Sequence, residues 1–424
     1  MTSLIQKRAK AILKKFNPVV IAVTGSQGKT STRRAITTVL RGRFTVREPQ
    51  KNFNNEIGVP LTILGEDSAG RSGIGWFAIL WRSFFIRTYP KYLVLEFGAD
   101  HPGDIQALVN LASPTVGVLT GISPVHAAYF ENIEALASEK GVLISSLPKD
   151  GLAILNVDDE RVALMKDTSI AEVQTYGMEG GSMSAKNVQI ATRLDDSFEP
   201  GEDLAVTTAD MLEDGKKIGS IQLKNFLGYA PISACLAAMT VGRHFGLSTK
   251  EMIETLQTDL MLVPGRLRPL AGIKGTLIID DTYNASPAAM HNGLMILSMF
   301  TPGEEWDRRI AVLGAMAELG QYSEEEHQRV GVHVAKVADV FIAVGDGMQA
   351  AVKAAKDAGM AKVEWFATSV EAGRYLDREL QQGDIAYVKG AQSTRMEYVV
   401  KDVMAQPTRA KHYLVRQGRK WLEE

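Results

Sequence analysis

Short apolar runs, each followed by a loop and a stretch with helical spacing, recur along the first part of the chain. They cover residues 18–24, 92–97, 115–121 and 152–158 and contain few polar positions. Strands of this composition are buried on both faces, which is typical of parallel sheets flanked by helices. The pattern therefore predicts an α/β fold with a mostly parallel sheet.

The pattern changes farther along the chain. Between 173 and 224, short runs alternate with Gly, Asp and Pro turns, which predicts a small antiparallel addition to the first sheet. A second series of apolar runs begins near Pro264 and Gly265 and predicts a Rossmann-like, doubly wound domain. Its predicted strands are 276–280, 309–314, 339–345, 362–367 and 384–390.

These patterns divide the chain into four parts. We expect a short amphipathic helix in residues 1–17 and a first α/β domain in 18–264, which includes the antiparallel addition. A second α/β domain is expected in 265–405, followed by a basic terminal segment in 406–424 that would form a solvated helix.

The apolar stretch 74–86 has two interpretations. It contains Arg82 and is shorter than the about 20 apolar residues that a membrane-spanning helix needs. We expect a helix packed under the core. The alternative is an exposed patch that contacts a membrane surface or a partner.

Composition narrows the range of functions. The chain has 424 residues, 45% of them hydrophobic, which is enough for two or three domains with large cores. A net charge of −2 lacks the basic excess of nucleic-acid-binding proteins. The single cysteine, Cys235, excludes a disulfide framework and is expected in the core. The first residues do not resemble a secretory signal, so we expect a cytoplasmic protein.

A glycine-rich loop, TGSQGKTST, separates the first predicted strand from a helix. Gly25 and Gly28 permit backbone conformations in which N–H groups, with the helix N-terminus, surround phosphate oxygens. Lys29 would reach the β and γ phosphates, and the Thr30 hydroxyl would face Mg²⁺. The general pattern has glycine at the position of Thr24, but the strand–loop–helix context supports a nucleotide site. Its residues are Thr24, Gly25, Ser26, Gln27, Gly28, Lys29, Thr30 and Ser31.

Three side chains beyond the loop are candidates for metal binding. Glu96 ends a buried strand, at the edge where ligands bind in open α/β sheets, and a carboxylate there needs a partner or a metal. Its oxygens suit Mg²⁺. His126 follows the next strand, and a lone histidine is more often structural or exposed than a ligand. Lys140 by itself indicates no function.

An ordered set of motifs resembles the Mur ligase family, whose members build the peptide of bacterial cell walls. The motifs are TGSQGKT, NFNNEIGVPLT, LEFGA, GISPVHAAYF, EKG, NVDD, PGR and IDDTYNASP. RRIAVLGAMAELG and YVKGAQ are similar to motifs of the MurF branch, which adds D-alanyl-D-alanine to a UDP-muramoyl tripeptide. The resemblance covers about residues 18–400. It implies an ATP-dependent carboxylate–amine ligase that forms an acyl phosphate and releases ADP.

The resemblance also implies roles in binding phosphate and metal. Lys29 would bind the γ phosphate, and Arg266, which follows the hinge glycine, would reach back to the phosphates. Thr30 and Glu96 would hold a first Mg²⁺, and His126 would help to hold a second. These five residues, with Lys140, form the expected catalytic set.

Lys140 matches a lysine that family members carry as a carbamate. Burial lowers the pKa of a lysine, so that its neutral amine can capture CO₂ and become an anion with oxygen donors for Mg²⁺. Asp281 resembles the aspartate that holds the ribose, and Asn284 lies beside it. Asn54 and Asn55 resemble residues near the phosphates and the substrate, and Lys389 and Arg395 are further candidates for binding the substrate.

The chain departs from the family pattern mainly where the substrate and the adenine would bind. A full-length MurF has an N-terminal domain that grips the uridine nucleotide, whereas about seventeen residues precede the first predicted strand here. The rest of the enzyme, a partner that supplies the domain, or a different substrate would have to compensate. Ala230 and Pro231 replace a His-Asn pair, Ala315 replaces an acidic residue, and Gln392 replaces an arginine for which Arg395 could substitute.

Two other functions stay open. The chain could be a Mur-type amide ligase that acts on another carboxylate and amine, such as a folate, a polyamino acid or a cofactor carboxylate. It could also be a nucleotide-binding scaffold that has lost ligation. Glu96, His126 and Lys140 argue against a scaffold, because a scaffold does not need a second metal.

Overall fold

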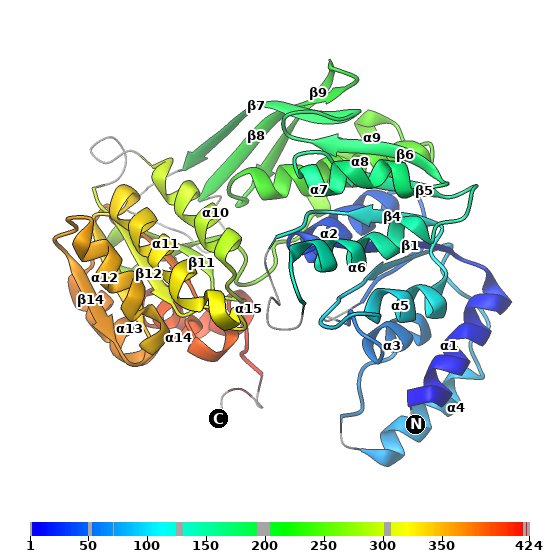
Figure 1. Ribbon diagram of the computed structural model, residues 1–424, viewed down its shortest axis with the longest axis horizontal. Coiled ribbons are helices and arrows are strands. Elements are labelled where there is room, and N and C mark those ends of the chain that lie inside the picture. Colours follow the sequence, from blue (N-terminus) through cyan, green and yellow to red (C-terminus); the bar gives the residue numbers. More distant parts are fainter. Residues whose placement is uncertain are drawn as a thin grey trace.

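The structure is a computed structural model that describes residues 2–49, 53–70, 72–123, 130–192, 204–300, 307–418 and 421. Two sheets with helices packed on their faces lie next to each other (Figure 1). Both are mainly parallel, so the predicted α/β fold class is confirmed. The strands of the first sheet are β1 (Val19–Thr24), β2 (Val46–Arg47), β3 (Tyr92–Glu96), β4 (Val116–Leu119), β5 (Leu152–Asn156), β6 (Glu172–Gly177), β7 (Met183–Thr192), β8 (Ala205–Glu213) and β9 (Lys216–Lys224).

The first sheet has the order β2-β3-β1-β4-β5-β6-β7-β8-β9. Its central strands are apolar on both faces, and successive residues of β1 enter different cores. Ile21 and Val23 pack with one layer of helices, whereas Val20 and Ala22 pack with the other. The first layer is α2 (Lys29–Arg41), α8 (Tyr229–His244) and α9 (Thr249–Asp259); the second is α1 (Thr2–Phe16), α3 (Gly58–Leu64), α5 (Asp104–Ala112), α6 (Ile133–Ser145) and α7 (Glu160–Ala163).

The predicted antiparallel addition is the far edge of this same sheet. β7, β8 and β9 pair antiparallel with one another, while β6 and β7 pair parallel. α8 packs against β6 and β7, and its residue Cys235 is fully buried, as expected for a core cysteine. Burial raises the pKa of the Cys235 thiol to about 12, so the side chain behaves as a small apolar group.

The second sheet contains every strand that was predicted after Gly265 and one that was not. The additional strand, β10, pairs antiparallel with β11 at the edge of the sheet, where its Pro269 is tolerated. The order is β10 (Arg268–Gly272), β11 (Thr276–Asp281), β15 (Ile385–Lys389), β12 (Arg309–Gly314), β13 (Val340–Val344) and β14 (Val363–Phe366). One face packs on α10 (Pro287–Ser298), α11 (Ser323–Val337) and α12 (Gln349–Asp357), and the other on α13 (Ser369–Glu379), α14 (Glu397–Val403) and α15 (Ala410–Tyr413).

The terminal segment corrects one expectation. Residues 407–418 are not a solvated helix, because Ala410 and Leu414 are buried in the core of the second domain. Arg416 donates hydrogen bonds to the Thr282 carbonyl oxygen and to the fully buried Glu397 carboxylate. The basic character of the segment therefore reflects, in part, an ion pair inside the domain.

The structure also corrects the expectation for the apolar stretch 74–86. It forms α4 (Gly73–Ser83), which packs on the core through the buried Ile79 and the partly buried Trp76 and Leu80. Ile74, Phe77 and Trp81 on the same helix are exposed. The expected packing therefore holds for one edge of α4 only, and the other side of the helix is an exposed apolar surface. Among the described residues, none of the helices combines the length and the apolar character that spanning a membrane requires.

Candidate active site

The loop between β1 and α2 has the backbone that its glycines predict. Gly28 has a φ of 76°, and α2 begins at the next residue, so the first N–H groups of the helix face the loop. A Cβ at Gly25 would collide with the Thr120 hydroxyl. The Lys29 ammonium donates to the carbonyl oxygens of Gly25 at 2.6 Å and of Ser26 at 3.3 Å. The loop is therefore a compact positively charged cradle.

Glu96, at the end of β3, is the carboxylate of this cradle. The residue is 4% exposed, and its Oε2 accepts a hydrogen bond from the Thr30 hydroxyl at 3.0 Å. The Asn54 amide donates to Oε1 at 3.4 Å, and Arg33 Nε lies 3.6 Å from Oε2. Thr30 and Glu96 come together because β1 and β3 are parallel neighbours, with Val23 paired to Glu96. The hydroxyl, carboxylate and amide oxygens form a donor set that suits Mg²⁺.

Two lysines near the loop have lowered pKa values. Burial lowers the pKa of the Lys29 ammonium; Glu96 opposes this shift and Arg266 adds to it. Lys140, on α6, is 1% exposed. Burial, and then the charge of Lys29, lower the pKa of Lys140 to about 7. A substantial fraction of Lys140 is therefore a neutral amine near neutral pH.

The remaining predicted metal ligand cannot be placed. His126 lies in 124–129, outside the described residues. Its role as a second metal ligand stays a prediction. Glu139, next to Lys140, accepts hydrogen bonds from the backbone N–H groups of Gly103 at 2.8 Å and Ile105 at 2.7 Å. This contact fixes α6 to the beginning of α5.

Arg266 connects the second domain to the phosphate loop. Gly265, with a φ of 67°, turns the chain, and a Cβ there would lie 2.8 Å from the Tyr283 backbone nitrogen. The Arg266 guanidinium lies 4.5 Å from the centre of the Tyr283 ring, and its Nη2 is 3.4 Å from Thr30 Oγ1. Its Nε is buried without a hydrogen-bond partner among the described residues. Phosphate oxygens would supply the missing acceptor, so the site fits a nucleotide.

Asp281 and Lys389, for which different roles were predicted, form one buried ion pair. Lys389 Nζ lies 2.6 Å from Asp281 Oδ2, to which the Tyr387 hydroxyl also donates at 3.1 Å. The pair forms because β11 and β15 are parallel neighbours and place the two residues opposite each other. Asp281 Oδ1 also accepts from the Leu267 backbone N–H at 3.3 Å. This contact supports the turn that carries Arg266.

Arg395 is also held by protein groups. Its guanidinium contacts Glu397 Oε1 at 2.7 Å, the Tyr398 hydroxyl at 2.7 Å and the Trp421 carbonyl oxygen at 2.8 Å. Sequence analysis did not single out Glu397, which is fully buried and is the partner of both Arg395 and Arg416. A glutamate two residues after an arginine is too common a pattern to identify such a centre.

The two asparagines of the NFNNEIG motif separate in the structure. Asn54 faces Glu96, whereas Asn55 Oδ1 accepts from the backbone N–H groups of Ile57 at 3.2 Å and Gly58 at 2.9 Å. Asn55 therefore caps the turn that leads into α3, and it does not line the cleft described below. At the other end of the loop, the Thr24 hydroxyl donates to the Phe97 carbonyl oxygen.

A cleft of about 1490 Å³ lies between the two domains and joins most of these groups. Several of the substituted positions line it, together with acidic side chains that sequence analysis did not identify as site residues. The lining includes Ser26, Gln27, Gly28, Lys29, Thr30, Ser31, Asn54, Glu96, Asp100, Asp158, Asp159, Ala230, Pro231, Arg266, Asp281, Asn284, Lys389, Gln392 and Arg395. The cleft therefore faces the phosphate loop on one side and the second domain on the other.

Known proteins share both domains. The model of the Mur ligase middle domain matches residues 23–241, and the model of the Mur ligase glutamate ligase domain matches residues 265–392. The chain belongs to the Mur ligase family. The predicted resemblance is thereby confirmed, and with it the enzyme class, an ATP-dependent, ADP-forming ligase.

Individual Mur ligases give the extent of the similarity. UDP-N-acetylmuramoyl-tripeptide–D-alanyl-D-alanine ligase of Mycobacterium leprae is 30% identical over 415 residues, which cover 92% of this chain and 74% of that protein. The enzyme of the same name from Bacillus subtilis is 27% identical, with 95% and 79% covered. The crystal structure of MurF ligase from Thermotoga maritima in complex with ADP superimposes with a TM-score of 0.75 at 26% identity, with 95% and 83% covered.

Proposed function

We propose that the protein joins a carboxylate to an amine at the expense of ATP, and that it adds D-alanyl-D-alanine to a muramoyl-peptide precursor in the cytoplasm. The observation that carries the proposal is that the phosphate loop, the Thr30–Glu96 pair and Arg266 lie close together in one interdomain cleft. The substrate pair is the one printed in the names of its relatives.

The chemistry proceeds in two balanced steps. A carboxylate oxygen attacks the γ phosphorus of ATP, the bond from that phosphorus to the bridging oxygen breaks, and ADP leaves. The amine nitrogen then attacks the acyl carbon, inorganic phosphate leaves, and the nitrogen loses a proton. Carboxylate and polyphosphate repel each other, and the charges of Lys29 and Arg266 with the α2 N-terminus offset that repulsion.

Thr30, Glu96 and Asn54 would hold a magnesium ion beside the phosphates, and His126 with Lys140 would hold a second. Bound Mg²⁺ supplies concentrated positive charge to the transferring phosphoryl group. For Lys140 we propose the carbamate, because its nearly complete burial and a pKa of about 7 favour the neutral amine that reacts with CO₂. The carbamate would contribute oxygen donors next to Lys29.

Closure of the cleft would protect the acyl phosphate from water. The two α/β domains, 18–264 and 265–405, would move about Pro264 and Gly265. The Gly265 N–H donates to Asp280 Oδ2 at 3.1 Å and its carbonyl oxygen accepts from Tyr283 N–H at 3.0 Å. These bonds anchor the hinge to the second domain, so that Arg266 would move with that domain.

The test is ADP release by purified protein given UDP-muramoyl tripeptide, D-alanyl-D-alanine, ATP and Mg²⁺. Release that needs both substrates is the expected result. The matched control is the Lys29→Ala variant, which should release ADP at least about a hundredfold more slowly. Absence of turnover with this pair by a folded protein that binds ATP would contradict the proposed substrates.

A second candidate is amide ligation of another carboxylate and amine. It is favoured by Ala230, Pro231 and Gln392, which line the cleft at positions where polar family residues are expected. Turnover with such a pair, together with an absence of turnover with the muramoyl tripeptide, would support this second function. ATP binding without turnover under any pair would instead indicate a scaffold.

A further inference from the structure

An apolar surface on α1, α4 and the two residues after α4 lies apart from the ligase cleft. We call it the α1–α4 surface and define it by the exposed side chains of Leu4, Ile74, Phe77, Trp81, Phe84 and Phe85, which are 55% to 84% exposed. Single exposed apolar residues are common, but a gathering of six on adjacent segments marks an interaction site. In Figure 1, α1 and α4 lie at the end of the first domain far from the second sheet.

The side chains of this surface are held in place. Arg8 donates to the Ser83 hydroxyl at 2.9 Å and to its carbonyl oxygen at 2.7 Å, and its guanidinium lies 4.1 Å from the centre of the Phe84 ring. The Trp81 and Phe85 rings are 4.7 Å apart. α1 and α4 therefore form a pre-arranged pair of helices rather than a loosely attached arm.

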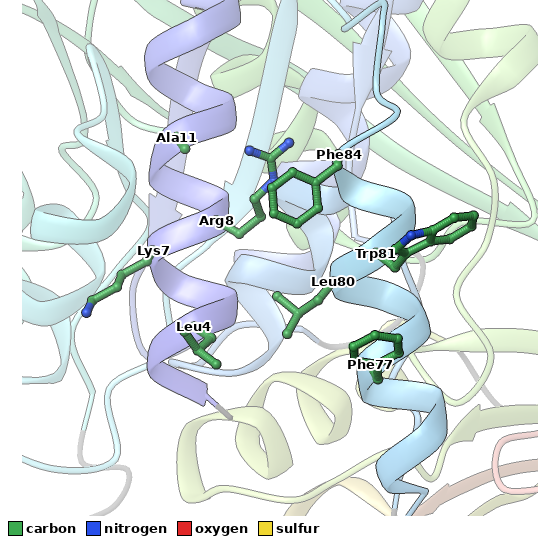
Figure 2. A pocket seen from close by; sticks show the side chains of 8 residues that line it. All are labelled: Leu4, Lys7, Arg8, Ala11, Phe77, Leu80, Trp81 and Phe84. Atoms are coloured by element: carbon green, nitrogen blue, oxygen red, sulfur yellow. The ribbon is translucent and has the colours of Figure 1, made fainter.

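A groove of about 420 Å³ runs between these two helices (Figure 2). Leu4 and Leu80 point into the space between the helices, and Trp81 lies on the outer side of α4. The groove is lined by Leu4, Lys7, Arg8, Ala11, Phe77, Leu80, Trp81 and Phe84, none of which lines the interdomain cleft. The α1–α4 surface is therefore a separate site.

The charged residues within α1 and α4 all have one sign. α1 and α4 contain six basic residues and no acidic residue, although the whole chain has a net charge of −2. Arg82 is paired with Glu66 at 2.5 Å, but the lysines of α1 are exposed. They are Lys7, Lys10, Lys14 and Lys15.

We propose that the α1–α4 surface binds the protein reversibly to an anionic lipid membrane. Lipid phosphates would pair with the lysines of α1 while the aromatic side chains of α4 enter the boundary of the acyl chains. A symmetric contact with a second copy fits less well, because it would place the same basic groups opposite each other. The site is independent of the ligase cleft and of the substrates proposed above.

The test is co-sedimentation of the full chain with vesicles. Vesicles of phosphatidylcholine mixed with phosphatidylglycerol should bind the protein, vesicles of phosphatidylcholine alone should bind it much more weakly, and added salt should release it. The Phe77→Ser/Trp81→Ser variant and the Lys10→Glu/Lys14→Glu variant should each bind the anionic vesicles at least about tenfold more weakly than the unmodified chain. Each of these four side chains is exposed, so the fold should persist, which thermal melting checks.

Two matched variants place the same changes elsewhere. Leu164→Ser/Ile170→Ser removes two equally exposed apolar side chains, and Lys149→Glu/Lys166→Glu makes the same change in charge. Both should bind vesicles like the unmodified chain. The proposal is overturned by absence of binding to anionic vesicles, by equal losses in the matched variants, or by a concentration-dependent dimer that Phe77→Ser/Trp81→Ser abolishes.

Discussion

The two sides of the interdomain cleft use charged residues in different ways. On the side of the first domain, Glu96 contacts a hydroxyl, an amide and a guanidinium group at 3.0 to 3.6 Å, and Lys29 contacts carbonyl oxygens of its own loop. On the side of the second domain, Asp281 is paired with Lys389 at 2.6 Å. Glu397 is paired with two arginines there.

This difference in pairing distinguishes residues that are available to bind ligands from residues that stabilise the fold. The contacts of Glu96 and Lys29 leave oxygen lone pairs and N–H donors for metal and phosphate. A buried ion pair such as Asp281–Lys389 leaves a charge without compensation when one partner is removed. Substitutions of Glu96 and Lys29 should therefore change turnover, and substitutions of Asp281, Lys389 and Glu397 should change stability.

The largest effect is expected for Lys29→Ala. Loss of a positive charge placed at the transferring phosphoryl group should lower kcat by about a hundredfold to a thousandfold, with little change in the melting temperature. ADP release and thermal melting measure the two quantities. The matched control is Lys149→Ala, at an exposed lysine. Turnover near the unmodified level in Lys29→Ala would show that the phosphate loop does not take part in the reaction.

Lys140→Ala should lose most of its activity, about tenfold to a hundredfold in kcat, because the carbamate oxygens are lost. Bicarbonate should not restore this variant, since it has no amine to modify. The unmodified protein should lose activity in buffer depleted of CO₂ and regain it on addition of bicarbonate. Near-normal turnover in Lys140→Ala would show that the carbamate assignment is wrong.

Lys389→Met should destabilise the protein by about 3 kcal/mol, because Asp281 keeps a buried negative charge. Urea unfolding measures the change. Lys389→Met/Asp281→Asn removes both charges and should recover part of the lost stability. Unfolding of Lys389→Met at the same urea concentration as the unmodified chain would mean that the pair does not stabilise the second domain.

The smallest effect is expected for Asn55→Ala, which removes the acceptor for two backbone N–H groups before α3. The expected loss of stability is about 1 kcal/mol, with KM for each substrate unchanged. Asn54→Ala is the informative comparison, since it should raise the Mg²⁺ concentration needed for half-maximal activity. A large rise in KM for the muramoyl peptide in Asn55→Ala would indicate that Asn55 contacts the substrate after all.

Local patterns predicted most of the strands and one half of the site. An apolar run that ends in a glycine-rich loop or a single carboxylate is visible along a few residues, so the phosphate loop and Glu96 could be recognised and placed at one sheet edge. Thr30 and Glu96 are 66 positions apart, and the predicted parallel strands were sufficient to bring them together. His126 falls outside the described residues, so the remainder of the metal site stays a prediction.

Sequence alone determined the order of strands and helices, the nucleotide loop and the membership in the family, because each depends on residues close together in the chain. Only the tertiary structure decided that Lys389 neutralises Asp281 across 108 positions and that Arg395 is held by Glu397. It also decided that Ala410 and Leu414 of the terminal segment are buried and that one side of α4 is exposed. The reason is that burial and ion pairing depend on which surfaces meet. An apolar helix has the same sequence pattern whether another surface covers it or not.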